Sequence, residues 1–174
     1  GVRDSKKLTD ADMLKIGPQL MEKIPHSLLI VTPQKYNQVH EENNLNAIKA
    51  KLHNQAYINL AKKINLPSFK IIDQFTPESL YYRYIKNEPQ IIRGIHFETK
   101  AEDKYLSVAV GSIISRYGFL KAWEEMEQKY DITFPKGSGD KVDILAQEFV
   151  DRYGFERLGE VAKLHFKNTE KIRV

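Results

Sequence analysis

The sequence contains no cysteine. This absence excludes a disulfide-bonded scaffold, a zinc site built on thiolates and a cysteine nucleophile. It fits a reducing compartment, and we expect the protein in the cytoplasm. A long hydrophobic run is also lacking, because the longest apolar-and-small stretch, 106–114, falls well short of the roughly 20 residues that a membrane span needs. The polar start of the chain has no initiator Met and no apolar signal-peptide core, so we expect no membrane partner and a chain that begins within a larger protein.

Neither sign of charge dominates the sequence. The 174 residues include 27 Lys and Arg against 23 Asp and Glu, which gives a net charge of +4 and an isoelectric point of about 9.1. Such a surplus permits a nucleic-acid partner but does not require one. With 41% hydrophobic and 29% charged residues, the composition excludes a disordered chain, a collagen-like chain and a coiled-coil rod. The length predicts one domain, and we expect a monomer.

Short apolar runs alternate with longer segments of helical periodicity, which predicts an α/β fold. Apolar residues at four-residue steps from Ile48 to Ile64 predict a helix that Asn46 caps. The apolar runs predict strands at 27–32, 69–73, 91–93 and 95–97. The other expected helices cover about 10–24, 34–38, 78–84, 101–130 and 140–153. Small and apolar residues throughout 106–114 predict that this part of its helix is buried on every side.

Carboxylates stand at two places where chemistry is expected. Asp73 ends an apolar run, where α/β sheets place their ligands, although a turn or helix cap is an equally good interpretation. Glu98, Glu102 and Asp103 surround the start of the next helix, and for them compensation of the helix dipole is the simpler explanation. If Asp73 and one of these acids converge, the pair suits one or two Mg²⁺ ions, which bind few protein carboxylates together with water and phosphate oxygens.

Three polar segments are candidates for phosphate or nucleic-acid contacts. Ser5, Lys6 and Lys7 precede the first helix and could hold phosphates, although a solvated loop explains them equally well. The loop 134–139 carries one basic residue, Lys136, and lacks the residue spacing of a Walker phosphate-binding loop. The segment 165–169 could contact a nucleic-acid backbone or could pack as an ordinary terminus.

Taken together, these segments resemble the type 2 ribonucleases H, and most closely the ribonuclease HIII group. The matching motifs, in the order of that family, are Asp4-Ser-Lys-Lys-Leu8, Ile71-Ile-Asp73-Gln-Phe75, Glu98-Thr-Lys-Ala-Glu102-Asp-Lys-Tyr105 with the helix 107–116 after it, Phe134-Pro-Lys-Gly-Ser-Gly139 and His165-Phe-Lys-Asn-Thr169. The resemblance covers nearly the whole chain. It implies a ribonuclease H-like mixed sheet flanked by helices.

The resemblance also implies an activity, which is two-metal-ion hydrolysis of the RNA strand of an RNA–DNA hybrid with Mg²⁺ or Mn²⁺ as cofactor. The family uses four acids, of which Asp73 matches the third and Glu102 the fourth. These two residues would therefore be catalytic and would hold the metal, with Glu98 and Asp103 ranked below Glu102. The residues that the resemblance implies for substrate binding are Ser5, Lys6, Lys7, Lys100, Lys136 and Lys167.

One part of the family pattern is missing. The first two acids of the family form an Asp-Glu pair in a glycine-rich strand, and this sequence contains no Asp-Glu dipeptide. We therefore expect residues 1–174 to be the carboxy-terminal portion of a catalytic domain, with the first strands of the sheet and the amino-terminal substrate-binding domain absent. On this view the parent protein is an endonuclease and the isolated chain is inactive. The alternatives are a non-catalytic nucleic-acid-binding module, in which the acids are structural caps, and a different metal-dependent nuclease.

Overall fold

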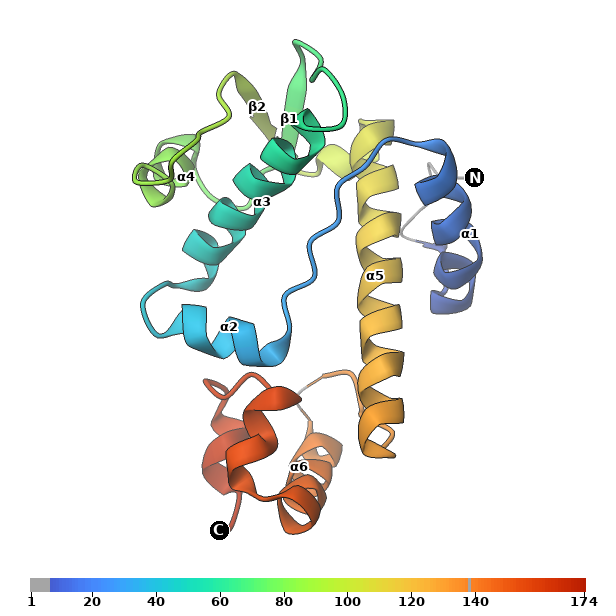
Figure 1. Ribbon diagram of the computed structural model, residues 1–174, viewed down its shortest axis with the longest axis vertical. Coiled ribbons are helices and arrows are strands. Elements are labelled where there is room, and N and C mark those ends of the chain that lie inside the picture. Colours follow the sequence, from blue (N-terminus) through green and yellow to red (C-terminus); the bar gives the residue numbers. More distant parts are fainter. Residues whose placement is uncertain (1–6, 138) are drawn as a thin grey trace. The chain divides into compact units, whose positions relative to one another are not determined.

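The computed structural model describes residues 7–137 and 139–174, and in these residues the protein is mostly helical with a small parallel sheet (Figure 1). The elements are, in chain order, α1 (Asp10–Lys23), α2 (Pro33–His40), α3 (Leu45–Ala61), β1 (Lys70–Asp73), α4 (Glu78–Tyr84), β2 (Ile95–Glu98), the 3-10 helix η2 (Ala101–Asp103), α5 (Leu106–Tyr130), α6 (Asp140–Tyr153) and the 3-10 helices η3 (Phe155–Glu160) and η4 (Lys167–Lys171). The predicted α/β class is confirmed.

The chain divides into two compact units. The first unit consists of residues 1–30 and 43–121, and the second consists of 31–42 and 122–174. The sheet lies in the first unit together with α1, α3 and α4. The second unit contains α2, α6, η3 and η4.

Most helices form near the predicted positions, but the helix expected over 101–130 begins at Leu106, after the separate 3-10 helix η2. Local capping signals fix the starts of α1, α2 and α3. Thr9 and Asp12 make a capping box at α1, in which the Thr9 side chain accepts from the Asp12 N–H and the Asp12 carboxylate accepts from the Thr9 N–H. Asn44 caps α3 by accepting from the Ala47 N–H, two residues before the predicted cap, Asn46.

Two predicted strands are absent from the described residues, since neither 27–32 nor 91–93 forms one. A strand needs a neighbour to satisfy its backbone groups, and in the described part of the chain only β1 and β2 pair. Leu28 instead packs against Gly118 of α5, where an added Cβ would lie 3.0 Å from a Leu28 methyl carbon. Ile30 is 55% exposed. The apolar run is therefore an extended chain that packs one side against a helix.

The prediction that 106–114 is buried on every side is wrong. Ala109 and Ile113 are buried, as expected for the side of α5 that packs against the first unit. Leu106, however, is 56% exposed, and no atom lies within 4 Å of the position that a Cβ on Gly111 would occupy. One side of this part of α5 is therefore open among the described residues.

The two strands are parallel and display opposite chemistry on their two faces. Ile72 pairs with Phe97, and Asp73 pairs with Glu98. Because side chains alternate along a strand, Ile72, Ile95 and Phe97 share the face that packs into a hydrophobic core. Asp73 and Glu98 share the other face. The alternation thus places both carboxylates on the same side of the sheet.

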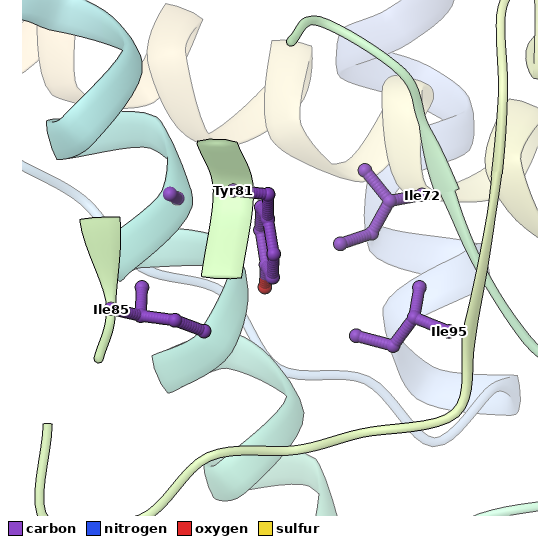
Figure 2. Close-up of a cluster of buried hydrophobic side chains, with 5 residues drawn as sticks. Ile72, Tyr81, Ile85 and Ile95 are labelled. Carbon is purple, nitrogen blue, oxygen red and sulfur yellow. The ribbon is translucent and has the colours of Figure 1, made fainter. Parts of the chain in front are cut away.

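The core beneath the first face contains a buried hydroxyl with no partner (Figure 2). The fully buried or nearly buried residues of this core are Ala50, Ile72, Tyr81, Ile85 and Ile95. The Tyr81 hydroxyl has no hydrogen-bond partner in the described structure, and burial raises the pKa of this phenol. An unsatisfied buried hydroxyl opposes folding.

We therefore expect Tyr81→Phe to leave the free energy of unfolding unchanged or to raise it by about 1 kcal/mol, because the substitution removes only the orphaned oxygen. The matched control is Tyr57→Phe, which should lower stability, since the Tyr57 hydroxyl bonds to both the N–H and the carbonyl of Ile71. Urea unfolding followed by circular dichroism measures both effects. A clear loss of stability in Tyr81→Phe would contradict the absence of a partner.

Gly17 allows a close approach between α1 and α5. A Cβ at this position would lie 2.5 Å from Cγ of Tyr117. The same pair of helices is joined by Arg116, whose guanidinium donates two hydrogen bonds to the Asp10 carboxylate, at 2.9 and 3.1 Å. Packing of α1 against α5 therefore requires glycine at position 17, although glycine has a low helix propensity.

We expect Gly17→Ala to destabilise the protein by about 1–3 kcal/mol, because the methyl group overlaps the root of the Tyr117 side chain. Gly111→Ala makes the same chemical change in α5 where space is open, and it should be neutral or stabilising by up to about 1 kcal/mol. Urea midpoints of the two variants test the pair. Equal midpoints would show that α1 does not approach α5 so closely.

Candidate active site

Asp73 is the last residue of β1, and its carboxylate is held by the turn that carries Glu102. The Ala101 N–H donates to Asp73 Oδ1 at 3.1 Å. Asp73 Oδ2 accepts no hydrogen bond from any residue that the structure describes. Ala101 is completely buried, so the turn is fixed against the end of the strand. One carboxylate oxygen is thus oriented by the fold, and the other is available to a ligand.

Glu102 follows Ala101 in η2 and lines a hollow of about 320 Å³ at the start of α5. The other lining residues are Asp103, Lys104, Tyr105, Leu106 and Ala109. The bond between Ala101 and Asp73 brings the segment that carries Glu102 to the carboxyl end of β1. The structure therefore brings the neighbourhoods of both predicted catalytic acids together. Their joint action on a metal remains a prediction.

Glu98 lies on the same face as Asp73 but serves the fold. Its carboxylate accepts hydrogen bonds from the Lys104 ammonium, from the Tyr105 hydroxyl at 2.9 Å and from His96 Nε2 at 3.0 Å. These donors, Lys104 first, lower the pKa of Glu98 to about 2. A carboxylate with three donors holds its turn in place, which agrees with ranking Glu98 below Glu102 as a metal ligand.

This network makes a pH-dependent contribution to stability. The pKa of Glu98 is about 2 in the folded protein, against an ordinary value of 4.5 for a glutamate, so the bound network stabilises the fold above pH 4.5. The contribution is lost as the pH falls from 4.5 toward 2. We expect Glu98→Gln to flatten the dependence of the urea midpoint on pH within this window. Glu88→Gln, which changes a carboxylate paired with Lys51 at 3.8 Å, should keep the wild-type slope.

The predicted substrate-binding residues fall in three places. Ser5 and Lys6 lie outside the described residues, and Lys7 is exposed just before α1. Lys100 caps η2 in a left-handed conformation, with φ 55°, one residue before Ala101. Lys136 and Lys167 lie in the second unit, where the Lys136 ammonium stands 6.0 Å from the centre of the Trp123 ring. Lys100 therefore adjoins the turn that carries Glu102.

Charge is distributed unevenly between the two units. The sequence of the first unit has 17 Lys and Arg against 10 Asp and Glu, whereas the second has 10 against 13. The whole positive surplus of the chain thus belongs to the unit that carries Asp73 and Glu102. A polyanion such as nucleic acid is attracted to a surface of this sign.

The segment 165–169 is largely occupied by packing within the second unit. His165 stacks on His40, with ring centroids 4.3 Å apart, and Asn168 donates to the Asp143 carboxylate. Asn37 fastens the chain just before this segment, because its amide donates to the carbonyls of Gly159 and Ala162. No local pattern in the sequence indicated this role of Asn37, since its partners lie more than a hundred residues away.

A model of the ribonuclease HII family matches residues 1–169. The chain belongs to this family. It is 43% identical to ribonuclease HIII of Bacillus mycoides (strain KBAB4) over 175 aligned residues, which cover 98% of this chain and 56% of the relative. Ribonuclease HIII of Listeria monocytogenes serotype 4b (strain CLIP80459) is also 43% identical, with 57% of its length covered. The resemblance to the type 2 ribonucleases H is confirmed.

A solved structure supports the fold. The crystal structure of Bst-RNase HIII in complex with Mn²⁺ matches with a TM-score of 0.95 and 38% identity, over 98% of this chain and 57% of that chain. This chain therefore spans a little over half the length of the relatives that it matches.

The candidate acids fit a hard divalent cation only in part. Carboxylate oxygens are the protein ligands that Mg²⁺ and Mn²⁺ prefer, and Mg²⁺ commonly takes one or two of them with water and phosphate. In residues 7–137 and 139–174, no group of three or more His, Asp or Glu side chains converges on a metal position. Asp73 and Glu102 would therefore contribute to a site that needs further ligands.

No helix within the described chain is long and apolar enough to cross a membrane.

Proposed function

We propose that the full-length protein containing this chain is an endoribonuclease that hydrolyses the RNA strand of RNA–DNA hybrids, as a monomer in the cytoplasm. Membership of the ribonuclease HII family supports the reaction class. The observation that carries the proposal for this chain is the hydrogen bond from Ala101 to Asp73, which brings the turn of Glu102 to the end of β1. Both acids that match the family quartet come from these two segments.

We further propose that residues 1–174 form the carboxy-terminal portion of the catalytic domain. The relatives are nearly twice as long, and this sequence holds candidates for only two of the four family acids. The other two acids, and the amino-terminal substrate-binding domain, would then be supplied by residues outside this chain. This arrangement explains why the described residues provide an incomplete set of ligands.

The roles of the side chains follow from their contacts. Asp73 would hold Mg²⁺ or Mn²⁺ through Oδ2 while Ala101 fixes Oδ1, and Glu102 would add a second carboxylate. When bound, the metal ions activate the attacking water and stabilise charge on the phosphate. Glu98 keeps the turn rigid through Lys104 and Tyr105. Lys100, beside the acids, would contact a phosphate of the substrate.

The test is a cleavage assay on the purified full-length protein. We expect it to cut a labelled RNA–DNA hybrid in Mg²⁺ or Mn²⁺, to leave double-stranded DNA and double-stranded RNA intact, and to lose all activity in EDTA. Binding of the hybrid without hydrolysis would instead establish the non-catalytic module, in which Asp73 only caps the turn at Ala101. Cleavage of double-stranded DNA or double-stranded RNA in place of the hybrid would indicate a different metal-dependent nuclease.

A further inference from the structure

A polar stripe on α3 runs alongside the end of β1. Lys49, His53 and Tyr57 lie at four-residue intervals and so share one side of the helix. The apolar stripe of the same helix starts one residue earlier, at Ile48. The spacing of the polar stripe can be read from the sequence, but its position beside the end of β1 is visible only in the structure.

Two contacts place this stripe relative to Asp73. The Tyr57 hydroxyl donates to the Ile71 carbonyl at 2.7 Å and accepts from the Ile71 N–H at 3.0 Å. One helical turn away, the His53 ring lies with its centroid 5.1 Å from that of Phe75. Asp73 lies midway between Ile71 and Phe75 in the sequence. His53 therefore stands close to the end of the strand that presents the candidate metal ligand.

The hydrogen bonding of His53 fixes its tautomer. Its Nδ1 lies 2.8 Å from the Lys49 carbonyl, and because a carbonyl oxygen only accepts, Nδ1 carries the proton. In the neutral ring, Nε2 then presents a lone pair. No residue that the structure describes donates to Nε2. The side chain as a whole is partly exposed.

The surroundings favour the neutral ring. Burial is the main cause that lowers the pKa of His53, and the charge of Lys49 acts in the same direction. The hydrogen bond to the Lys49 carbonyl and the attraction of Asp73 oppose this shift only in part. A neutral Nε2 cannot donate to a carboxylate or a phosphate oxygen. It requires a ligand that donates a hydrogen bond, such as a hydroxyl group.

We propose that His53 Nε2 accepts a hydrogen bond from a ribose 2′-hydroxyl of the strand bound at Asp73 and Glu102. This inference rests on the proposed function and names a residue by which the site distinguishes RNA from DNA. The 2′-hydroxyl is the donor that RNA has and DNA lacks. Lys49, whose ammonium stands 5.3 Å from the centre of the Phe75 ring, adds a positive charge beside the same segment, where a phosphate would follow the ribose.

The test is a double-mutant cycle read by binding, in the full-length protein with Ca²⁺ in place of the catalytic metal. The ligands are two hybrids whose RNA strand carries either 2′-hydroxyl or 2′-fluoro groups. The protein variants are wild type and His53→Phe, which keeps a ring against Phe75 and removes both nitrogens. If Nε2 accepts from a 2′-hydroxyl, the preference for the hydroxyl hybrid should be roughly three- to tenfold smaller in His53→Phe.

Two further variants separate contact with the substrate from support of the helix. His53→Gln places an acceptor near the position of Nε2, whereas His53→Asn keeps only a donor near Nδ1 for the Lys49 carbonyl. We expect Gln to restore part of the preference and Asn to restore none. The matched control is His26→Gln, in a histidine whose Nδ1 also contacts a carbonyl, that of Ile24 at 2.9 Å, and it should leave the preference unchanged.

An equal preference in wild type and His53→Phe would overturn the inference, as would restoration by Asn alone, because that result assigns His53 to the helix. The cycle does not depend on cleavage. A protein that binds the hybrids and does not cut them would refute the proposed function, while the His53 contact would still be read from the binding constants.

Discussion

Asp73→Asn is expected to reduce hybrid cleavage by the full-length protein roughly hundredfold or more, with binding of the hybrid retained. Asparagine keeps the size of the side chain, and its Oδ1 can still accept from the Ala101 N–H. The substitution removes the negative charge that would hold the metal. Glu102→Gln should act in the same direction, because it makes the same change at the second candidate ligand.

The comparison needs a carboxylate that the site does not use. Glu88→Gln removes an equivalent charge from the same unit, at a residue paired with Lys51, and should leave turnover near the wild-type value. Cleavage rates in Mg²⁺ and Mn²⁺, with dissociation constants measured in Ca²⁺, separate chemistry from binding. Near-normal turnover of Asp73→Asn would remove Asp73 from the metal site.

Residues 1–174 expressed alone are expected to show no metal-dependent cleavage of RNA–DNA hybrid, whereas the full-length protein shows it. Two carboxylates leave a Mg²⁺ ion with few anchoring charges, and a second ion has almost no ligand from the described residues. The small sheet is a second reason, because the described residues form only two strands, and a two-stranded sheet has little stability of its own.

The measurement compares both forms at equal concentration in the same hybrid-cleavage assay, with EDTA as the blank. Circular dichroism and urea unfolding show whether the shorter form is folded, so that loss of ligands can be distinguished from loss of structure. Robust cleavage by residues 1–174 would mean that the four-acid mechanism of the family does not describe this protein.

Local signals in the sequence predicted much of this fold. Thr9 and Asp12 form the capping box that starts α1, and the periodicity from Ile48 onward follows α3. The apolar residues before Asp73 form β1 as predicted. Each of these features depends on residues within a few positions of one another, where sequence patterns are most informative.

The errors and omissions concern partners far away in the chain. The run 27–32 has the composition of a strand but no neighbouring strand among the described residues, so Leu28 packs against α5 instead. The side chain of Asn37 binds carbonyls beyond position 158, and no local pattern indicates such a bond. The acids Asp73 and Glu102 are indicated by resemblance, but the bond from Ala101 that joins their segments is visible only in the structure.

The bond between Ala101 and Asp73 has a consequence for the entropy of catalysis. A free aspartate samples several rotamers, and a metal that binds it must select one of them at a cost in side-chain freedom. Here the backbone amide makes that selection during folding, and Oδ2 already has its direction before any ligand arrives. If Asp73 holds a metal ion as proposed, its carboxylate is oriented before binding, and less of the binding energy of metal and substrate would go into ordering it.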